Sequence, residues 1–158
     1  MSVWEQILNL LFLPKCPFCR RILDSPGVCD TCRKELPWTE EHEAVREGTD
    51  SLRCAAPLGK VREAILRLKF SGAAATAETL GALMAQCAAE HLSGEFDLVT
   101  WVPVSRKRRW KRGYDQAELL ARAVCRVWGV KPVALLRKTM NNPAQSGLKE
   151  DAARRAKI

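Results

Sequence analysis

The spacing of four cysteines near the N-terminus constrains this chain more than any other feature. The segment "CPFCRRILDSPGVCDTC" places Cys16, Cys19, Cys29 and Cys32 in the pattern C-x2-C-x9-C-x2-C. Two residues between thiols let both sulfurs of a pair face one ion, and four sulfurs at about 2.3 Å complete a tetrahedral zinc site. We therefore predict a zinc ribbon with structural Zn²⁺, since four protein ligands leave no position open for a catalytic water. The alternative is four buried or redox-active thiols without a metal.

The composition is that of a globular protein. The chain has 158 residues, of which 47% are hydrophobic and 28% charged. No apolar run approaches the roughly 20 residues of a membrane helix. The N-terminal apolar stretch follows Glu5, without a basic region before it or a cleavage site after it, and so predicts a short amphipathic helix rather than a signal peptide. We expect a cytoplasmic protein, where paired cysteines favour metal over disulfides.

Hydrophobic spacing after the ribbon predicts alternating helices and strands. Helices are expected over 61–70 and 73–92, and a third begins near Gln116. The continuous apolar runs 94–104 and 129–138 suit strands, the first of them buried on both faces of a parallel sheet. Strand, loop, helix and strand make a βαβ unit, which predicts an α/β fold. The buried stripe of the second helix is expected to hold Leu80, Leu83, Met84 and Cys87.

Charge is concentrated in the C-terminal part of the chain. Residues 1–100 hold 11 Lys and Arg against 14 Asp and Glu, whereas residues 101–158 hold 15 against 4. Six of these basic residues occupy the seven positions from Arg106 to Arg112, within "SRKRRWKRGYDQ". This asymmetry favours an anionic partner, either nucleic acid or a phosphorylated small molecule.

Three interpretations of the basic run stay open: a phosphate-binding loop, a nucleic-acid contact, and a solvated turn. Its expected place between a buried strand and a helix favours the first, because ligands bind there in α/β folds and the helix N-terminus offers N–H groups to anions. Gly113 permits a tight turn, and Asp115 is a candidate cap for the helix that follows. Trp110 would serve the second interpretation as a stacking platform for bases.

Several motifs, taken in order, resemble the ComF family. They are "LPKC", the four-cysteine ribbon, "LRLKFSG", "VPVSRKRRWKRGYDQAELLA" and "RKTMNNPAQSGL". The resemblance spans essentially the whole chain, and "RGYDQAELLA" is its most specific part. It implies an N-terminal helix and a zinc ribbon in residues 1–38. Residues 39–158 would form a phosphoribosyltransferase-like α/β domain of Rossmann type. It also implies a possible connection with DNA uptake during natural competence.

The resemblance assigns roles to particular residues. The segment from Pro103 to Gly113 matches the family's pyrophosphate-binding loop, and Lys69 and Gly72 match the element that precedes the core. A mobile loop over the active site would include Thr139 and Gln145. The positions that match the phosphate- and pyrophosphate-binding residues are Arg108, Arg112, Gly113 and Gln116.

One departure from the family limits the expected chemistry. Phosphoribosyltransferases hold 5-phosphoribosyl-1-pyrophosphate and Mg²⁺ with two acidic residues followed by a turn of Thr and Gly, and this chain has no such motif. The resemblance is therefore to a member whose α/β domain is incomplete at its C-terminus, and we expect no transferase catalysis from this chain. The predicted function is binding of phosphate or pyrophosphate through the basic loop. The alternative is a zinc-ribbon module that binds single-stranded DNA.

Overall fold

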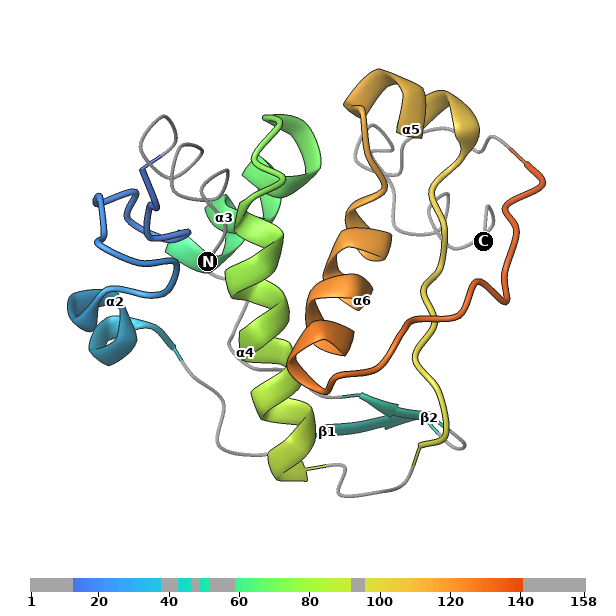
Figure 1. The fold of residues 1–158 in the computed structure, drawn as a ribbon, viewed down its shortest axis with the longest axis horizontal. Helices are drawn as coiled ribbons and strands as arrows, with labels where there is room; N and C mark the ends of the chain where they lie inside the picture. The colour runs from blue at the N-terminus through green and yellow to red at the C-terminus, as the bar shows by residue number, and fades with distance from the viewer. Residues whose placement is uncertain (1–12, 38–42, 47–48, 52–58, 92–95, 141–158) are drawn as a thin grey trace.

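A computed structural model of the chain describes residues 13–37, 43–46, 49–51, 59–91 and 96–140. The described part is mostly helical and begins with the four-cysteine segment (Figure 1). In chain order its elements are helix α2 (Asp30–Glu35), strands β1 (Glu43–Arg46) and β2 (Thr49–Ser51), and helices α3 (Gly59–Phe70), α4 (Thr76–His91), α5 (Arg106–Arg112) and α6 (Gln116–Val127). The two strands pair with each other in an antiparallel hairpin. Among the helices of these described ranges, none has the length and apolar composition of a membrane span.

The helices expected over 61–70, over 73–92 and from Gln116 are confirmed as α3, α4 and α6. Helix α3 begins two residues before the predicted start, and α4 begins three residues after it. At the start of α6, Asp115 is the N-cap, and its carboxylate accepts hydrogen bonds from the N–H groups of Ala117 and Glu118. Such a cap satisfies donors that have no partner inside the helix.

Helices α4 and α6 lie side by side in the middle of the molecule (Figure 1). Their contact is made by small residues, since Ala77, Gly81 and Ala85 form the buried stripe of α4. A Cβ atom added at Gly81 would lie 2.3 Å from the Cβ of Ala123 in α6. The expected stripe is therefore wrong in part: Met84 is 42% exposed, because a close helix crossing excludes long side chains at this interface.

The expected strands at 94–104 and 129–138 do not form in the described residues. Residues 96–104 and 130–140 run as extended chain with one backbone hydrogen bond between them, from the N–H of Val133 to the carbonyl of Val99, 2.8 Å long. Pro103 and Pro132 have no N–H to give a ladder. The N–H of Val104 donates to the Asp115 carboxylate, at 2.8 Å, instead of to a neighbouring strand.

Burial of the first run on both faces is also wrong. The side chains of the two extended segments are largely in contact with solvent, and Val102 is 71% exposed. The described part of the chain therefore shows a four-cysteine segment and a mostly helical region, without the parallel sheet of an α/β domain. The exposed large apolar residues of these segments are Phe96, Leu98, Val102, Val130, Val133, Leu135, Leu136 and Met140.

The hydrophobic core joins the cysteine segment to the helices. Val61 and Ala64 of α3 belong to the same buried cluster as the cysteines, and Leu80 and Leu83 of α4 pack against it. The buried members from the cysteine segment are Cys16, Phe18, Cys29, Cys32 and Leu36. One face of α3 therefore lies directly on the ribbon, and the domain boundary at residue 38 stays a prediction.

Candidate metal centre and the adjoining basic surface

The first pair of cysteines sits in a tight turn of the chain. The N–H of Cys16 donates to the carbonyl of Arg21, and the N–H of Arg20 donates to the carbonyl of Cys16, both at 2.9 Å. Arg20 has a φ of 66°, a left-handed conformation that lets the chain reverse immediately after Cys19. Lys15 and Ile22 close the turn as an isolated antiparallel bridge.

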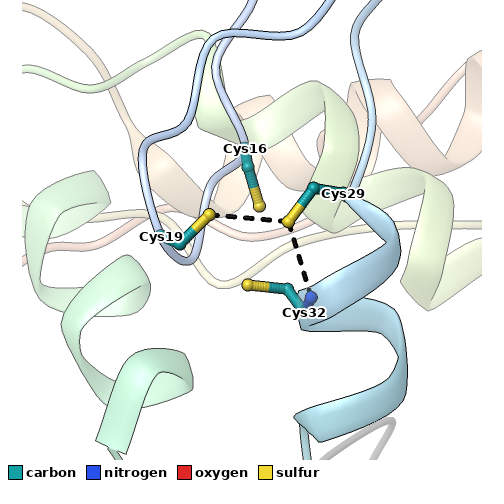
Figure 2. A group of neighbouring side chains, drawn as sticks. All are labelled: Cys16, Cys19, Cys29 and Cys32. Atoms are coloured by element: carbon teal, nitrogen blue, oxygen red, sulfur yellow. Dashed lines mark hydrogen bonds between the residues drawn. The ribbon is translucent and has the colours of Figure 1, made fainter.

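The second pair of cysteines lies at the start of helix α2. Cys29 is the N-cap, and its sulfur accepts a hydrogen bond of 3.4 Å from the N–H of Cys32. The helix therefore fixes the two sulfurs on the same side of the chain. Figure 2 shows all four side chains pointing toward one another from the turn and from the helix start.

The four sulfurs form a compact group that fits a zinc ion. They all lie within 4.8 Å of one another, and the sulfurs of Cys19 and Cys29 are 3.5 Å apart. A regular Zn(Cys)4 tetrahedron with bonds of about 2.3 Å has sulfur–sulfur edges of about 3.8 Å. The cysteine cluster (Cys16, Cys19, Cys29 and Cys32) is thus compatible with a structural Zn²⁺ site of the knuckle type, as the sequence predicts.

Electrostatics within the cysteine cluster favour a cation. Burial disfavours the thiolate of Cys16, but N–H groups of Cys19, Cys29 and Phe18 donate to its sulfur and lower its pKa to about 6. Burial and the three neighbouring sulfurs raise the pKa of Cys32 to about 12. Without a metal, a thiolate at one cysteine therefore disfavours ionisation of the neighbouring thiols. A divalent cation stabilises all four thiolates together.

Helix α3 supplies a cation to the backbone of the first turn. Arg67 donates through Nη2 to the carbonyl oxygens of Pro17 and Phe18, which lie between the two cysteines of that turn. Its other terminal nitrogen pairs with Glu63 at 3.5 Å. Spacing along the sequence gives no signal for this contact, because about 50 residues separate Arg67 from the turn.

The basic run forms helix α5 instead of the expected loop. Arg and Lys are good helix formers, and the helix ends at Gly113, whose φ of 81° is left-handed and whose N–H donates to the carbonyl of Arg109 at 2.8 Å. Trp110 is 89% exposed on this helix. We call the basic surface the set of cations that α5 carries at Arg106, Lys107, Arg109, Lys111 and Arg112.

Arg112 occupies a defined place in the basic surface. Its Nη1 donates to Oε1 of Gln116 at 2.8 Å, and its guanidinium lies 5.0 Å from the centre of the Phe70 ring at the end of α3. Both partners are uncharged. By contrast, Arg109 is paired with the carboxylate of Glu118 at 3.3 Å.

Two of the N–H groups at the start of α6, those of Ala117 and Glu118, donate to the side chain of Asp115. The Asp115 carboxylate is buried and accepts from Ala117, Glu118 and Val104. The capping prediction for Asp115 is confirmed. The contribution of this helix end to anion binding stays a prediction.

The other predicted binding residues are partly placed together. Gln116 lies beside Arg112, and Gly113 directly follows α5. Arg108 lies on α5 and is half-buried. Thr139 is exposed in the extended chain, and Gln145 lies outside the described residues. Whether these residues bind phosphate stays a prediction.

No protein-family model, curated protein or solved structure matches this chain. The class that the geometry supports is a four-cysteine metal-binding protein compatible with zinc. The resemblance to the ComF family stays a prediction.

Proposed function

We propose that this chain is a ComF-like protein that binds phosphate or pyrophosphate groups through its basic surface, with a zinc ribbon as structural support. A relation to phosphoribosyltransferases and to DNA uptake belongs to the same proposal. The chain has no acidic pair followed by Thr and Gly, so we propose binding and derive no transferase step. In family members that carry this acidic motif, Mg²⁺ would accompany 5-phosphoribosyl-1-pyrophosphate.

The observation that carries the proposal is the placement of Arg112. Its guanidinium is held between the Phe70 ring and the Gln116 side chain, which orient it without neutralising its charge. An oriented guanidinium suits phosphate oxygens, because its donors form a planar fork that binds two oxygens at once. The exposed side chains of Arg106, Lys107 and Lys111 add positive charge on the same short helix.

The test is a calorimetric titration of the zinc-loaded protein with inorganic pyrophosphate. We expect saturable binding that weakens at least tenfold in Arg112→Glu. Arg62→Glu is the matched control. Arg62 is an exposed arginine on α3, and this substitution reverses the same charge outside the basic surface. Equal affinities for the two variants would show that Arg112 is only a solvated side chain.

Single-stranded nucleic acid is the second candidate ligand, and Trp110 is the observation that favours it. An indole that is 89% exposed among cations offers a stacking platform beside a backbone-binding surface. Loss of one stacked base costs about 1–3 kcal/mol. We expect Trp110→Ala to weaken binding of a single-stranded oligonucleotide at least fivefold and to leave pyrophosphate binding unchanged.

Salt separates the two ligands. Oligonucleotide binding should fall steeply as salt rises, because each neutralised phosphate releases counterions. A higher affinity for pyrophosphate than for the oligonucleotide at every salt concentration supports the first candidate. Tight oligonucleotide binding that pyrophosphate fails to displace supports the second.

A further inference from the structure

Three contacts meet within the last turn of helix α3. Arg67 donates to the carbonyls of Pro17 and Phe18 in the cysteine turn. One residue later, the carbonyl of Leu68 accepts a hydrogen bond of 2.6 Å from the hydroxyl of Tyr114. Two residues after that, the Phe70 ring faces the guanidinium of Arg112 at 5.0 Å. The same helical turn therefore touches the candidate metal centre and the end of α5.

The contact between Tyr114 and Leu68 completes the hydrogen bonding at the end of α3. The carbonyl of Leu68 is among the last four of its helix, which have no partner inside that helix, and the Tyr114 hydroxyl supplies one. Burial raises the pKa of Tyr114, with Arg112 acting against it, so the hydroxyl remains a donor. Leu68 itself is buried, which ties the turn to the core.

We propose that this turn, which we call the α3 joint (Arg67, Leu68 and Phe70), makes phosphate binding at the basic surface depend on the metal at the cysteine cluster. The proposal rests on the proposed function for its ligand. Arg67, Phe70 and Tyr114 are positioning residues in it. Phe70 and Tyr114 hold the end of α5, Arg67 holds α3 to the cysteine turn, and none of them touches either ligand.

The physical basis is the folding of the ribbon around its metal. Four-cysteine modules lose their fold when the metal is removed, since the binding energy of the metal is folding energy. Loss of the cysteine turn removes the two carbonyls that hold Arg67 and the apolar residues on which α3 packs. The partners of Tyr114 and Arg112 then lose their fixed position, and orientation of the Arg112 guanidinium is lost with them.

Coupling of this kind is reciprocal. If zinc raises the affinity for pyrophosphate by some factor, pyrophosphate must raise the affinity for zinc by the same factor. We expect a factor of about five or more, the lower part of the range for coupled sites. It is measured as the ratio of pyrophosphate dissociation constants in chelated and zinc-loaded protein, and checked by zinc retention against a chelator with and without pyrophosphate.

Two variants separate the joint from general unfolding. Tyr114→Phe removes one hydroxyl, and Arg67→Met removes the guanidinium but keeps much of its apolar stem. Both keep the four cysteines and should retain zinc and helical content. We expect each to reduce the coupling factor toward one and to weaken pyrophosphate binding by zinc-loaded protein several-fold. Arg62→Met, an exposed arginine on the same helix, is the matched control and should leave both unchanged.

Hydrogen exchange of residues 106–114 tests the joint without any ligand. Zinc should slow exchange of the α5 amides in the native protein, and less so in Tyr114→Phe and Arg67→Met. If pyrophosphate does not bind but exchange depends on zinc in this way, the proposed function fails. The structural connection from the cysteine cluster through the joint to α5 then still stands. If pyrophosphate binds and neither affinity nor exchange depends on zinc, the joint is wrong. A coupling factor in Tyr114→Phe and Arg67→Met equal to that of the native protein would also overturn the proposed role of the joint.

Discussion

Asp115 joins two parts of the chain through one buried carboxylate. It caps α6 through Ala117 and Glu118 and also accepts from the N–H of Val104 in the extended segment. The basic helix α5 lies between these two attachments, so Asp115 closes the base of the segment that carries the basic surface. A single acidic residue is therefore used here for structure, within a strongly basic part of the sequence.

Replacing Asp115 tests this structural use. Asp115→Ala should lower the free energy of unfolding by about 2–4 kcal/mol, because it removes a helix cap and leaves buried N–H donors without acceptors. Asp115→Asn keeps one acceptor oxygen and should lose less. Denaturant unfolding of the zinc-loaded variants measures both. Equal losses for Ala and Asn would mean that the charge, and not the hydrogen bonds, is what matters.

A second prediction at the scale of single residues concerns zinc binding by the cysteine cluster. The native protein should contain about one zinc per chain by elemental analysis, and Cys32→Ser should lose it, because a neutral hydroxyl replaces a thiolate ligand. Cys87→Ser is the control, since Cys87 lies on α4 outside the cluster. A native preparation that is fully folded and free of metal contradicts the zinc assignment.

At the scale of elements, the crossing of α4 and α6 depends on the absence of a side chain at Gly81. A Cβ there would lie 2.3 Å from the Ala123 Cβ and 3.2 Å from backbone atoms of α6. Gly81→Ala gains about 1 kcal/mol of helix propensity but overpacks the interface at a cost of about 1–3 kcal/mol. We expect thermal unfolding at a lower temperature than in the native protein. Gly27→Ala, with nothing within 4 Å of the added Cβ, should unfold as the native protein does. Equal stability of both variants would mean that the helices separate at little cost.

The sequence predicts well those elements whose structure is determined by residues close to one another in the chain. The cysteine cluster depends on a spacing of 17 residues, and α6 on a cap and an apolar stripe next to each other. Predictions failed where distant partners decide. The two extended runs needed a sheet around them, and the contacts of Arg67 and Tyr114 span 46 to 50 residues without any local pattern. Helix α5 is an intermediate case, because Gly113 was recognised as a turn residue but not as the end of a helix.

At the scale of the whole molecule, metal binding links the fold to pH. All four cysteine thiols must lose their protons for zinc to bind, and the pKa of Cys32 is raised to about 12 by burial and its neighbouring sulfurs. Zinc binding therefore releases protons, and the apparent zinc affinity should fall as the pH falls. Titration with zinc at pH 6, 7 and 8 checks this, with proton release measured in buffers of different ionisation enthalpy. An affinity that does not change with pH would contradict binding through thiolates.

The two exposed extended segments have a consequence for how this protein is studied in solution. Apolar side chains such as Val102 and Leu135 face water while the helices are intact. Dyes such as 1-anilinonaphthalene-8-sulfonate fluoresce on such surfaces and are widely taken as reporters of partial unfolding. A folded preparation of this chain should already bind the dye. Its folding is therefore better followed by the circular dichroism of its helices, and bright dye fluorescence should not be used to reject a variant.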